Sequence, residues 1–173
     1  MVIKKAIVLF LFVLLGSRTN FAQSKDSITV NFFLLEDCKI CQYYAPTIQQ
    51  LYDDYDNEHI TFIGYFPNRY SSEKDIATFK EKYKIPFKLK KEFFQTRTQK
   101  YNVTVTPEVV VYNETTDKII YQGRIDNSYA KLGKRRRVVT EHELSVVLDN
   151  INKGSELVKS KTKAIGCLIT LVE

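Results

Sequence analysis

The chain has 173 residues, a formal net charge of +6 and three cysteines. This length suits one domain with a single hydrophobic core. Three cysteines are too few for a scaffold stapled by disulfides, and the modest charge gives little reason to expect a nucleic-acid partner.

Residues 1–22 have the layout of a secretory signal peptide. Two lysines precede an unbroken apolar run from Ala6 to Leu15, which is too short to be a membrane span of about 20 residues. Cleavage after Ala22 would leave 23–173 as a single domain. Because the leader carries three cations and no acidic residue, its removal lowers the net charge from +6 to +3. The alternative is an uncleaved anchor, and only then do we expect contact with a membrane.

The first core element is expected at Ile28–Leu35, an almost continuous apolar run typical of a strand buried on both faces of a sheet. Apolar residues then recur at three- and four-residue spacing from about Lys39 to Asp56, which predicts a helix kinked by Pro46. Ile60–Phe66 predicts a second strand.

The rest of the chain is expected to alternate in the same way. In chain order, we expect a helix at Glu73–Tyr83, a loop or short strand from Pro86, a short helix at Phe93–Tyr101, strands at Glu108–Tyr112 and Lys118–Gln122, and a helix between Thr140 and Gly154. Thr140 and Glu143 have the spacing of a capping box. The apolar end of the tail, Ala164–Val172, is expected to pack against the domain.

Cys38 and Cys41 lie between the first strand and the first helix. The free amides and the dipole at a helix start stabilise a thiolate, so a cysteine pKa of about 8.5 can fall to roughly 3.5–7.5 there. Two intervening residues let one turn bring the sulfur atoms together. The spacing therefore indicates a dithiol that can become a disulfide, although a structural disulfide or a pair of core thiols would have the same spacing.

The order of the elements and several motifs resemble the thioredoxin fold. Cys38-Lys39-Ile40-Cys41 is followed by Ala45-Pro46 at the thioredoxin spacing, and Thr106-Pro107-Glu108 looks like the cis-proline signature. Motifs from Tyr121 to Asn127 and from Thr162 to Ile169 resemble bacterial redoxin-domain proteins of the AhpC/TSA and TlpA-like group. The resemblance implies an α/β fold with a central mixed sheet flanked by helices, a redoxin-type insertion and a C-terminal tail.

The resemblance also implies roles for individual residues. Cys38 would attack the disulfide of a partner and Cys41 would resolve the mixed disulfide, with Cys38 the more exposed of the two. Thr106 and Pro107 would bind the substrate, because a cis bond there turns the Thr106 backbone towards the cysteine pair. We expect no cofactor beyond the Cys38–Cys41 disulfide, and no metal site, since zinc needs four ligands.

The same resemblance gives the partners, and the expected signal peptide gives the location. We expect an exported thiol–disulfide oxidoreductase of the bacterial periplasm, working as a monomer on protein thiols and disulfides with an upstream electron donor or acceptor. Three positions bear on this. Asp37 replaces the usual aromatic residue, Phe32 stands where thioredoxins keep a buried acid, and Glu92 matches an acidic position of many redoxins but is expected to be a surface charge.

Cys167 is the remaining cysteine. Ile165, Leu168 and Ile169 surround it, so we expect a buried apolar thiol. The alternative is a third redox partner, if the tail folds back to the cysteine pair.

Two other functions remain open at this stage. A peroxiredoxin-like peroxidase would need a threonine three residues before its cysteine, where this chain has Leu35. A copper or haem-assembly chaperone of the thioredoxin fold would use cysteines separated by three residues with a distant histidine, whereas the gap here is two.

Overall fold

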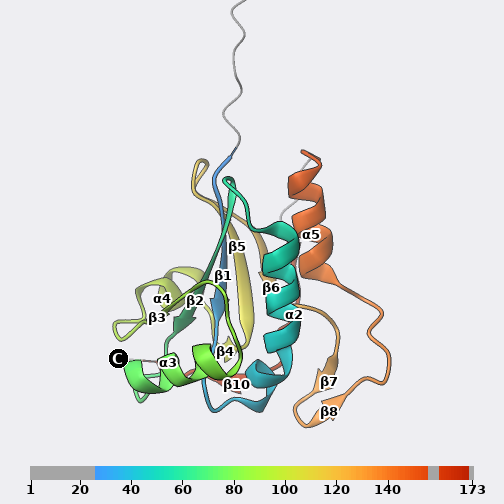
Figure 1. Cartoon of the computed structure of the whole chain (residues 1–173). Helices are drawn as coiled ribbons and strands as arrows, with labels where there is room; N and C mark the ends of the chain where they lie inside the picture. The colour runs from blue at the N-terminus through green and yellow to red at the C-terminus, as the bar shows by residue number, and fades with distance from the viewer. Residues whose placement is uncertain (1–25, 156–159, 172–173) are drawn as a thin grey trace, which may run out of the picture.

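The computed structural model describes residues 26–155 and 160–171 (Figure 1). The expected signal peptide lies outside these residues, so its presence and its cleavage stay predictions. Among the described residues, no helix combines the length and apolar character needed to cross a membrane.

The centre of the molecule is a six-stranded mixed sheet in the order β3-β2-β1-β5-β6-β9. Its strands are β1 (Ile28–Phe33), β2 (Ile60–Phe66), β3 (Lys88–Lys91), β5 (Glu108–Asn113), β6 (Lys118–Gly123) and β9 (Ser160–Lys161). β1 pairs in parallel with β2 on one edge and antiparallel with β5 on the other. β5 and β6 form the expected hairpin.

Helices cover both faces of this sheet (Figure 1). Three pack on one face, α2 (Lys39–Tyr55), α3 (Glu73–Lys82) and α5 (Glu143–Asn152), and α4 (Thr96–Tyr101) packs on the other. α2 runs through Pro46 as one helix. The predicted α/β arrangement of a mixed sheet flanked by helices is confirmed. In the sequence, α3 and β3 come between β2 and α4. In the sheet, β3 is the edge strand next to β2.

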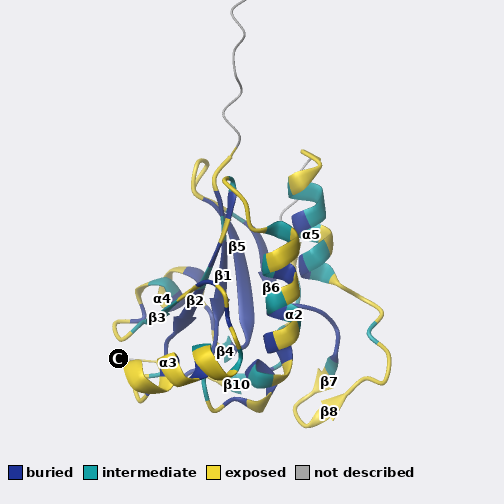
Figure 2. Cartoon of the chain, viewed as in Figure 1, coloured by how far each residue is buried: buried dark blue, intermediate teal, exposed yellow. Residues whose placement is uncertain are grey.

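The core has two parts, one on each face of β1. Val30 and Phe32 face the larger part, where Phe32 stacks on Phe62 and Phe87. Phe33 faces the smaller part with Tyr65 and Tyr101. Burial of β1 and β5 on both faces explains their nearly continuous apolar sequences (Figure 2).

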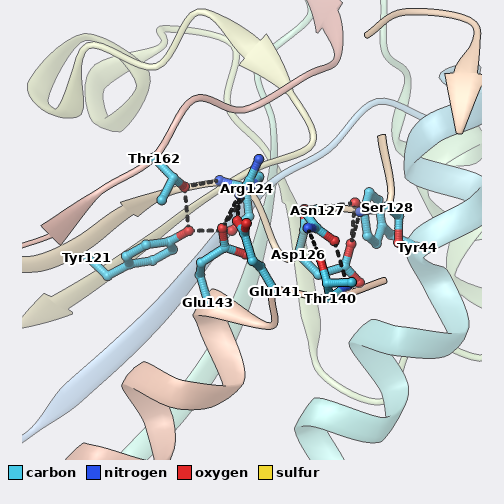
Figure 3. Close-up of polar contacts among 10 residues, drawn as sticks. All are labelled: Tyr44, Tyr121, Arg124, Asp126, Asn127, Ser128, Thr140, Glu141, Glu143 and Thr162. Atoms are coloured by element: carbon cyan, nitrogen blue, oxygen red, sulfur yellow. Dashed lines mark hydrogen bonds and ion pairs between the residues drawn. The ribbon is translucent and has the colours of Figure 1, made fainter. Parts of the chain in front are cut away.

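The capping box expected at the start of the last helix is wrong. α5 begins at Glu143, and its N-cap residue His142 makes no side-chain cap. Thr140 instead exchanges two hydrogen bonds with Asn127, and Glu143 forms an ion pair with Arg124 (Figure 3). Thr140 and Glu143 therefore bind residues distant in the sequence instead of capping the N-terminus of α5. Gly154 follows the helix with φ +64°, as a C-terminal glycine should.

Two short pairs of strands lie beside the sheet. β4 (Val105–Thr106) pairs antiparallel with β10 (Cys167–Leu168), and β7 (Tyr129–Lys131) pairs with β8 (Lys134–Arg135). Both pairs lie near the end of the molecule where α2 begins (Figure 1). The tail therefore packs as expected, although Leu168 and Leu171 point to solvent.

Burial on α5 provides a test of the core. Leu144 is fully buried and Val146, two residues on, is 55% exposed. We expect Leu144→Ala to lower the free energy of unfolding by about 2–5 kcal/mol, because it leaves a cavity between α5 and the sheet. Val146→Ala on the same helix should change it by less than about 0.5 kcal/mol. Urea denaturation of both variants measures the difference, and equal effects would contradict the assigned faces.

Candidate active site

The cysteine pair lies at the junction of β1 and α2. After β1 the chain turns at Glu36 and Asp37, and Cys38 becomes the N-cap residue of α2, with its carbonyl accepting from the Gln42 amide at 3.0 Å. Cys41 lies in the first turn of the helix and is fully buried. The pair thus lies where it was predicted, between the end of β1 and the first turn of α2, with Cys38 as the N-cap residue.

The Cys38 thiol has a pKa far below the ordinary value, so it favours the negatively charged thiolate. Its pKa falls to about 5, chiefly because the Cys41 thiol donates a hydrogen bond to its sulfur. Burial opposes this shift, and further hydrogen bonds from the Cys167 thiol and from the amides of Cys41 and Ile40 assist it. Hydrogen-bond donors at the helix start, more than the charge of Lys39, therefore hold the thiolate.

Cys41 shows the opposite behaviour. Burial raises its pKa well above the ordinary value, and the neighbouring Cys38 charge raises it further. The amide of Leu35, which donates to Cys41 Sγ at 3.4 Å, acts in the other direction. The pair thus consists of one thiolate and one thiol that donates to it.

Thr106 and Pro107 lie directly against the pair. The peptide bond between them is cis, as predicted. Cys38 Sγ lies 3.3 Å from the Thr106 carbonyl oxygen. Phe33 at the end of β1 is in register with Glu108 at the start of β5, so the residues just before β5 meet the chain that leaves β1. The predicted substrate-binding residues and the predicted catalytic residues therefore form one cluster.

Cys38 is more exposed than Cys41, as expected, but only by a small margin, because both cysteines are buried. Cys38 is only 1% exposed, close to the 0% of Cys41. Tyr129 from β7 and Cys167 from β10 both pack against the core that contains Cys38. Segments far away in the sequence therefore contribute to the core that contains Cys38.

Cys167 is not the buried apolar thiol that we expected. It is half-buried, lies opposite Thr106 in the β4–β10 pair, and its thiol donates a hydrogen bond to the Cys38 thiolate. Burial and the Cys38 charge together raise the Cys167 pKa to about 12. The fold thus brings the third thiol to the pair, which was the alternative considered for it.

A polar network fixes the loop that carries Tyr129 (Figure 3). Tyr44 of α2 donates to the Asp126 carboxylate at 2.7 Å, and the amide of Ser128 donates to the same oxygen at 2.7 Å. Burial and Asp126 raise the pKa of Tyr44, so its hydroxyl stays a donor. Asn127 and Thr140 join the two ends of the β7–β8 excursion. This network was not predicted from the sequence. The polar residues Asp126, Asn127 and Ser128 after β6 were the feature that could have indicated it.

Two acidic residues have roles that the sequence did not reveal. The Glu92 carboxylate accepts from the Arg97 amide and from the Thr98 amide and hydroxyl, so it caps α4 instead of being a free surface charge. Glu108, next to Pro107, is buried, and burial raises its pKa while Gln122 donates to it at 2.8 Å. An acidic residue at the start of an otherwise apolar strand was the sequence feature that could have indicated a buried carboxyl group at Glu108.

Within residues 26–155 and 160–171, no three His, Cys, Asp or Glu side chains are grouped to hold a metal ion. His59 pairs with Glu58 at 3.1 Å, and His142 is the exposed N-cap of α5. The structure thus gives neither histidine a position with the cysteines.

Comparison with known proteins relates this chain to others by structure. No protein-family model and no curated protein sequence match the chain. An uncharacterized conserved protein from Geobacillus kaustophilus superposes with a TM-score of 0.73 at 21% identity, over 86% of this chain and 79% of that one. A hypothetical protein from Sinorhizobium meliloti gives 0.71 at 19% identity, over 84% and 80%.

A third solved structure carries a description of its fold. The thioredoxin domain of a thiol-disulfide oxidoreductase from Bacteroides vulgatus superposes with a TM-score of 0.53 at 14% identity, over 74% of this chain and 81% of that one. Together with the sheet order, the cysteine pair at the start of α2 and the cis proline, this shows that the chain has a thioredoxin-like fold.

The ionisation of Cys38 can be measured directly. We expect the ultraviolet absorbance of the reduced protein to show one thiol that ionises near pH 5. Cys41→Ala should raise this pKa because it removes the strongest donor, and Cys41→Ser should raise it less because a hydroxyl can still donate. A titration near the ordinary cysteine value in the unchanged protein would contradict the proposed hydrogen bonds.

Proposed function

We propose that this chain is an exported thiol–disulfide oxidoreductase that exchanges the Cys38–Cys41 dithiol with disulfides of other proteins. The observation that carries the proposal is the position of Cys38 at the N-terminus of α2, with its Sγ 3.3 Å from the carbonyl oxygen of Thr106, the residue before the cis bond to Pro107. Its place of action outside the cytoplasm depends on the predicted signal peptide.

The first step uses the charge on Cys38. The thiolate attacks one sulfur of a partner disulfide, a Cys38–partner bond forms, and the partner's own sulfur–sulfur bond breaks. The leaving sulfur departs as a thiolate and takes up a proton. At neutral pH Cys38 needs no base for this attack, because its pKa is about 5.

The second step depends on the loss of that charge. In the reduced protein, the hydrogen bond to Cys38 and its negative charge both raise the Cys41 pKa. Both contributions disappear once Cys38 is part of a mixed disulfide, while the Leu35 amide still favours a Cys41 thiolate. Cys41 therefore becomes easier to ionise when it is needed to attack Cys38 Sγ, release the reduced partner and close the Cys38–Cys41 disulfide.

The approach of a partner requires movement at β10. An extended segment that adds to the Thr106 edge by main-chain pairing would occupy the place that β10 now holds. With Cys38 1% exposed, a protein disulfide also cannot reach the sulfur in the closed arrangement. We infer that β10 leaves β4 when a protein partner binds.

The mixed disulfide provides the test of this function. Incubation with insulin as a disulfide-bonded test protein should give Cys41→Ser/Cys167→Ser an adduct through Cys38 that reductant removes. Cys167 is replaced too, because its thiol contacts Cys38. The matched control Cys38→Ser/Cys167→Ser keeps only the high-pKa Cys41 and should form at least about tenfold less adduct. Equal adduct in both variants, or none in either, would contradict the proposal.

The reduction potential should depend on pH in a way set by the two thiol pKa values. Above pH 5, reduction of the disulfide takes up two electrons and one proton, because Cys38 stays ionised and Cys41 does not. The potential should therefore fall by about 30 mV per pH unit between pH 6 and 8, and by about 60 mV per unit below the Cys38 pKa. Equilibration with glutathione over this range measures the slope, and about 60 mV throughout would rule out a Cys38 thiolate.

A further inference from the structure

β10 holds Cys167 in a defined register beside the cysteine pair. Cys167 lies opposite Thr106 and Leu168 opposite Val105, and the Ile169 amide donates to the Thr104 carbonyl at 3.0 Å. Thr106 thus meets Cys38 through its carbonyl and Cys167 through strand pairing. The same residue positions both sulfur atoms.

The neighbours of Cys167 explain why this strand lies so close. A Cβ atom at Gly166 would overlap the Thr106 carbonyl oxygen, so only glycine allows this approach. Ile169 is buried in the smaller core, whereas Leu168 is 79% exposed. Of the two residues of β10, Cys167 therefore packs against the larger core and Leu168 points to solvent.

We propose that Cys167 is a second resolving cysteine, which attacks Cys38 Sγ in a mixed disulfide and forms a Cys38–Cys167 disulfide in competition with Cys41. The proposal rests on the function proposed above, since it needs Cys38 as the nucleophile. It gives the protein two internal disulfides that share Cys38.

The chemistry balances without any further reactant. The oxidant is the disulfide of the partner or of glutathione, which is reduced to two thiols as Cys38 and Cys167 are each oxidised by one electron. In the resolving step a Cys38–Cys167 bond forms, the bond from Cys38 to the partner sulfur breaks, and the proton of Cys167 passes to the leaving thiolate or to water.

The ionisation of Cys167 supports this order of events. Its pKa is raised by burial, by the hydrogen bond that it donates to Cys38, and by the Cys38 charge. The last two causes vanish when Cys38 enters a disulfide. Only burial then remains, and Cys167 is half-buried whereas Cys41 is completely buried. The burial penalty on ionisation is therefore smaller for Cys167 than for Cys41, although only Cys41 has the Leu35 amide as a hydrogen-bond donor.

Glutathione disulfide is a suitable probe, because a small adduct needs less displacement of β10 than a protein partner. We compare three variants, each lacking Cys41. Cys41→Ser keeps Cys167, Cys41→Ser/Cys167→Ser has no second thiol, and Cys41→Ser/Cys167→Ser/Leu168→Cys moves the thiol one residue along the same strand to an exposed position. Mass mapping of the unreduced peptides identifies each disulfide.

In Cys41→Ser we expect a Cys38–Cys167 disulfide and release of glutathione at least about tenfold faster than in the variant without a second thiol. The Leu168→Cys variant should keep its glutathione on Cys38. A stable glutathione adduct on Cys38 in Cys41→Ser would overturn the inference and leave the proposed function standing. Equal disulfide formation by Leu168→Cys would also overturn it, because the register would then not position the thiol. Failure of Cys38 to react in all three variants would overturn both proposals.

Discussion

Pairing of β1 along both of its edges is the constraint on which the rest of the site depends. Phe33, the last residue of β1, is in register with Tyr65 of β2 and with Glu108 of β5. The first pairing fixes the end of the sheet at which α2 starts. The second brings Thr106 and Pro107 beside the turn that leads to Cys38. A slip of one residue between β1 and β5 would exchange the two faces of β5 and move the Thr106 carbonyl away from the sulfur.

Within this frame, hydrogen-bond donors stabilise a charge that burial alone would disfavour. A buried anion is costly unless it is paired or hydrogen-bonded, and the Cys38 thiolate has donors from two parts of the chain: the start of its own helix, which includes Cys41, and the tail. These hydrogen bonds stabilise a thiolate only while Cys38 is reduced. When Cys38 enters a disulfide, Cys41 and Cys167 lose their acceptor, and both become better nucleophiles. Under the proposed function, the redox state of Cys38 would thus modulate the pKa values of the other two thiols, which burial raises in either state.

Much of this could be predicted from sequence because the relevant signals are local. Apolar runs indicated β1 and β2, the spacing of the cysteines placed them at a helix start, and Thr106-Pro107 was recognised from its resemblance to a known signature. The errors arose where distant residues compete for a side chain. Thr140 and Glu143 have a local capping pattern, but Asn127 and Arg124 bind them. Cys167 lies in an apolar segment, but pairing between β10 and β4, which are about 60 residues apart, turns it to Cys38.

The position of β10 links access to the site with its redox state. In the reduced protein, β10 is held by strand pairing, by burial of Ile169 and by the hydrogen bond from Cys167 to the Cys38 thiolate. The last of these contacts is strongest while Cys38 is charged. Oxidation to the Cys38–Cys41 disulfide removes the charge, so β10 should leave β4 more easily in the oxidised protein. A tail joined to Cys38 through Cys167 would instead be fixed in place. Under the two proposals, the internal disulfide that forms would decide whether the Thr106 edge is open to a partner.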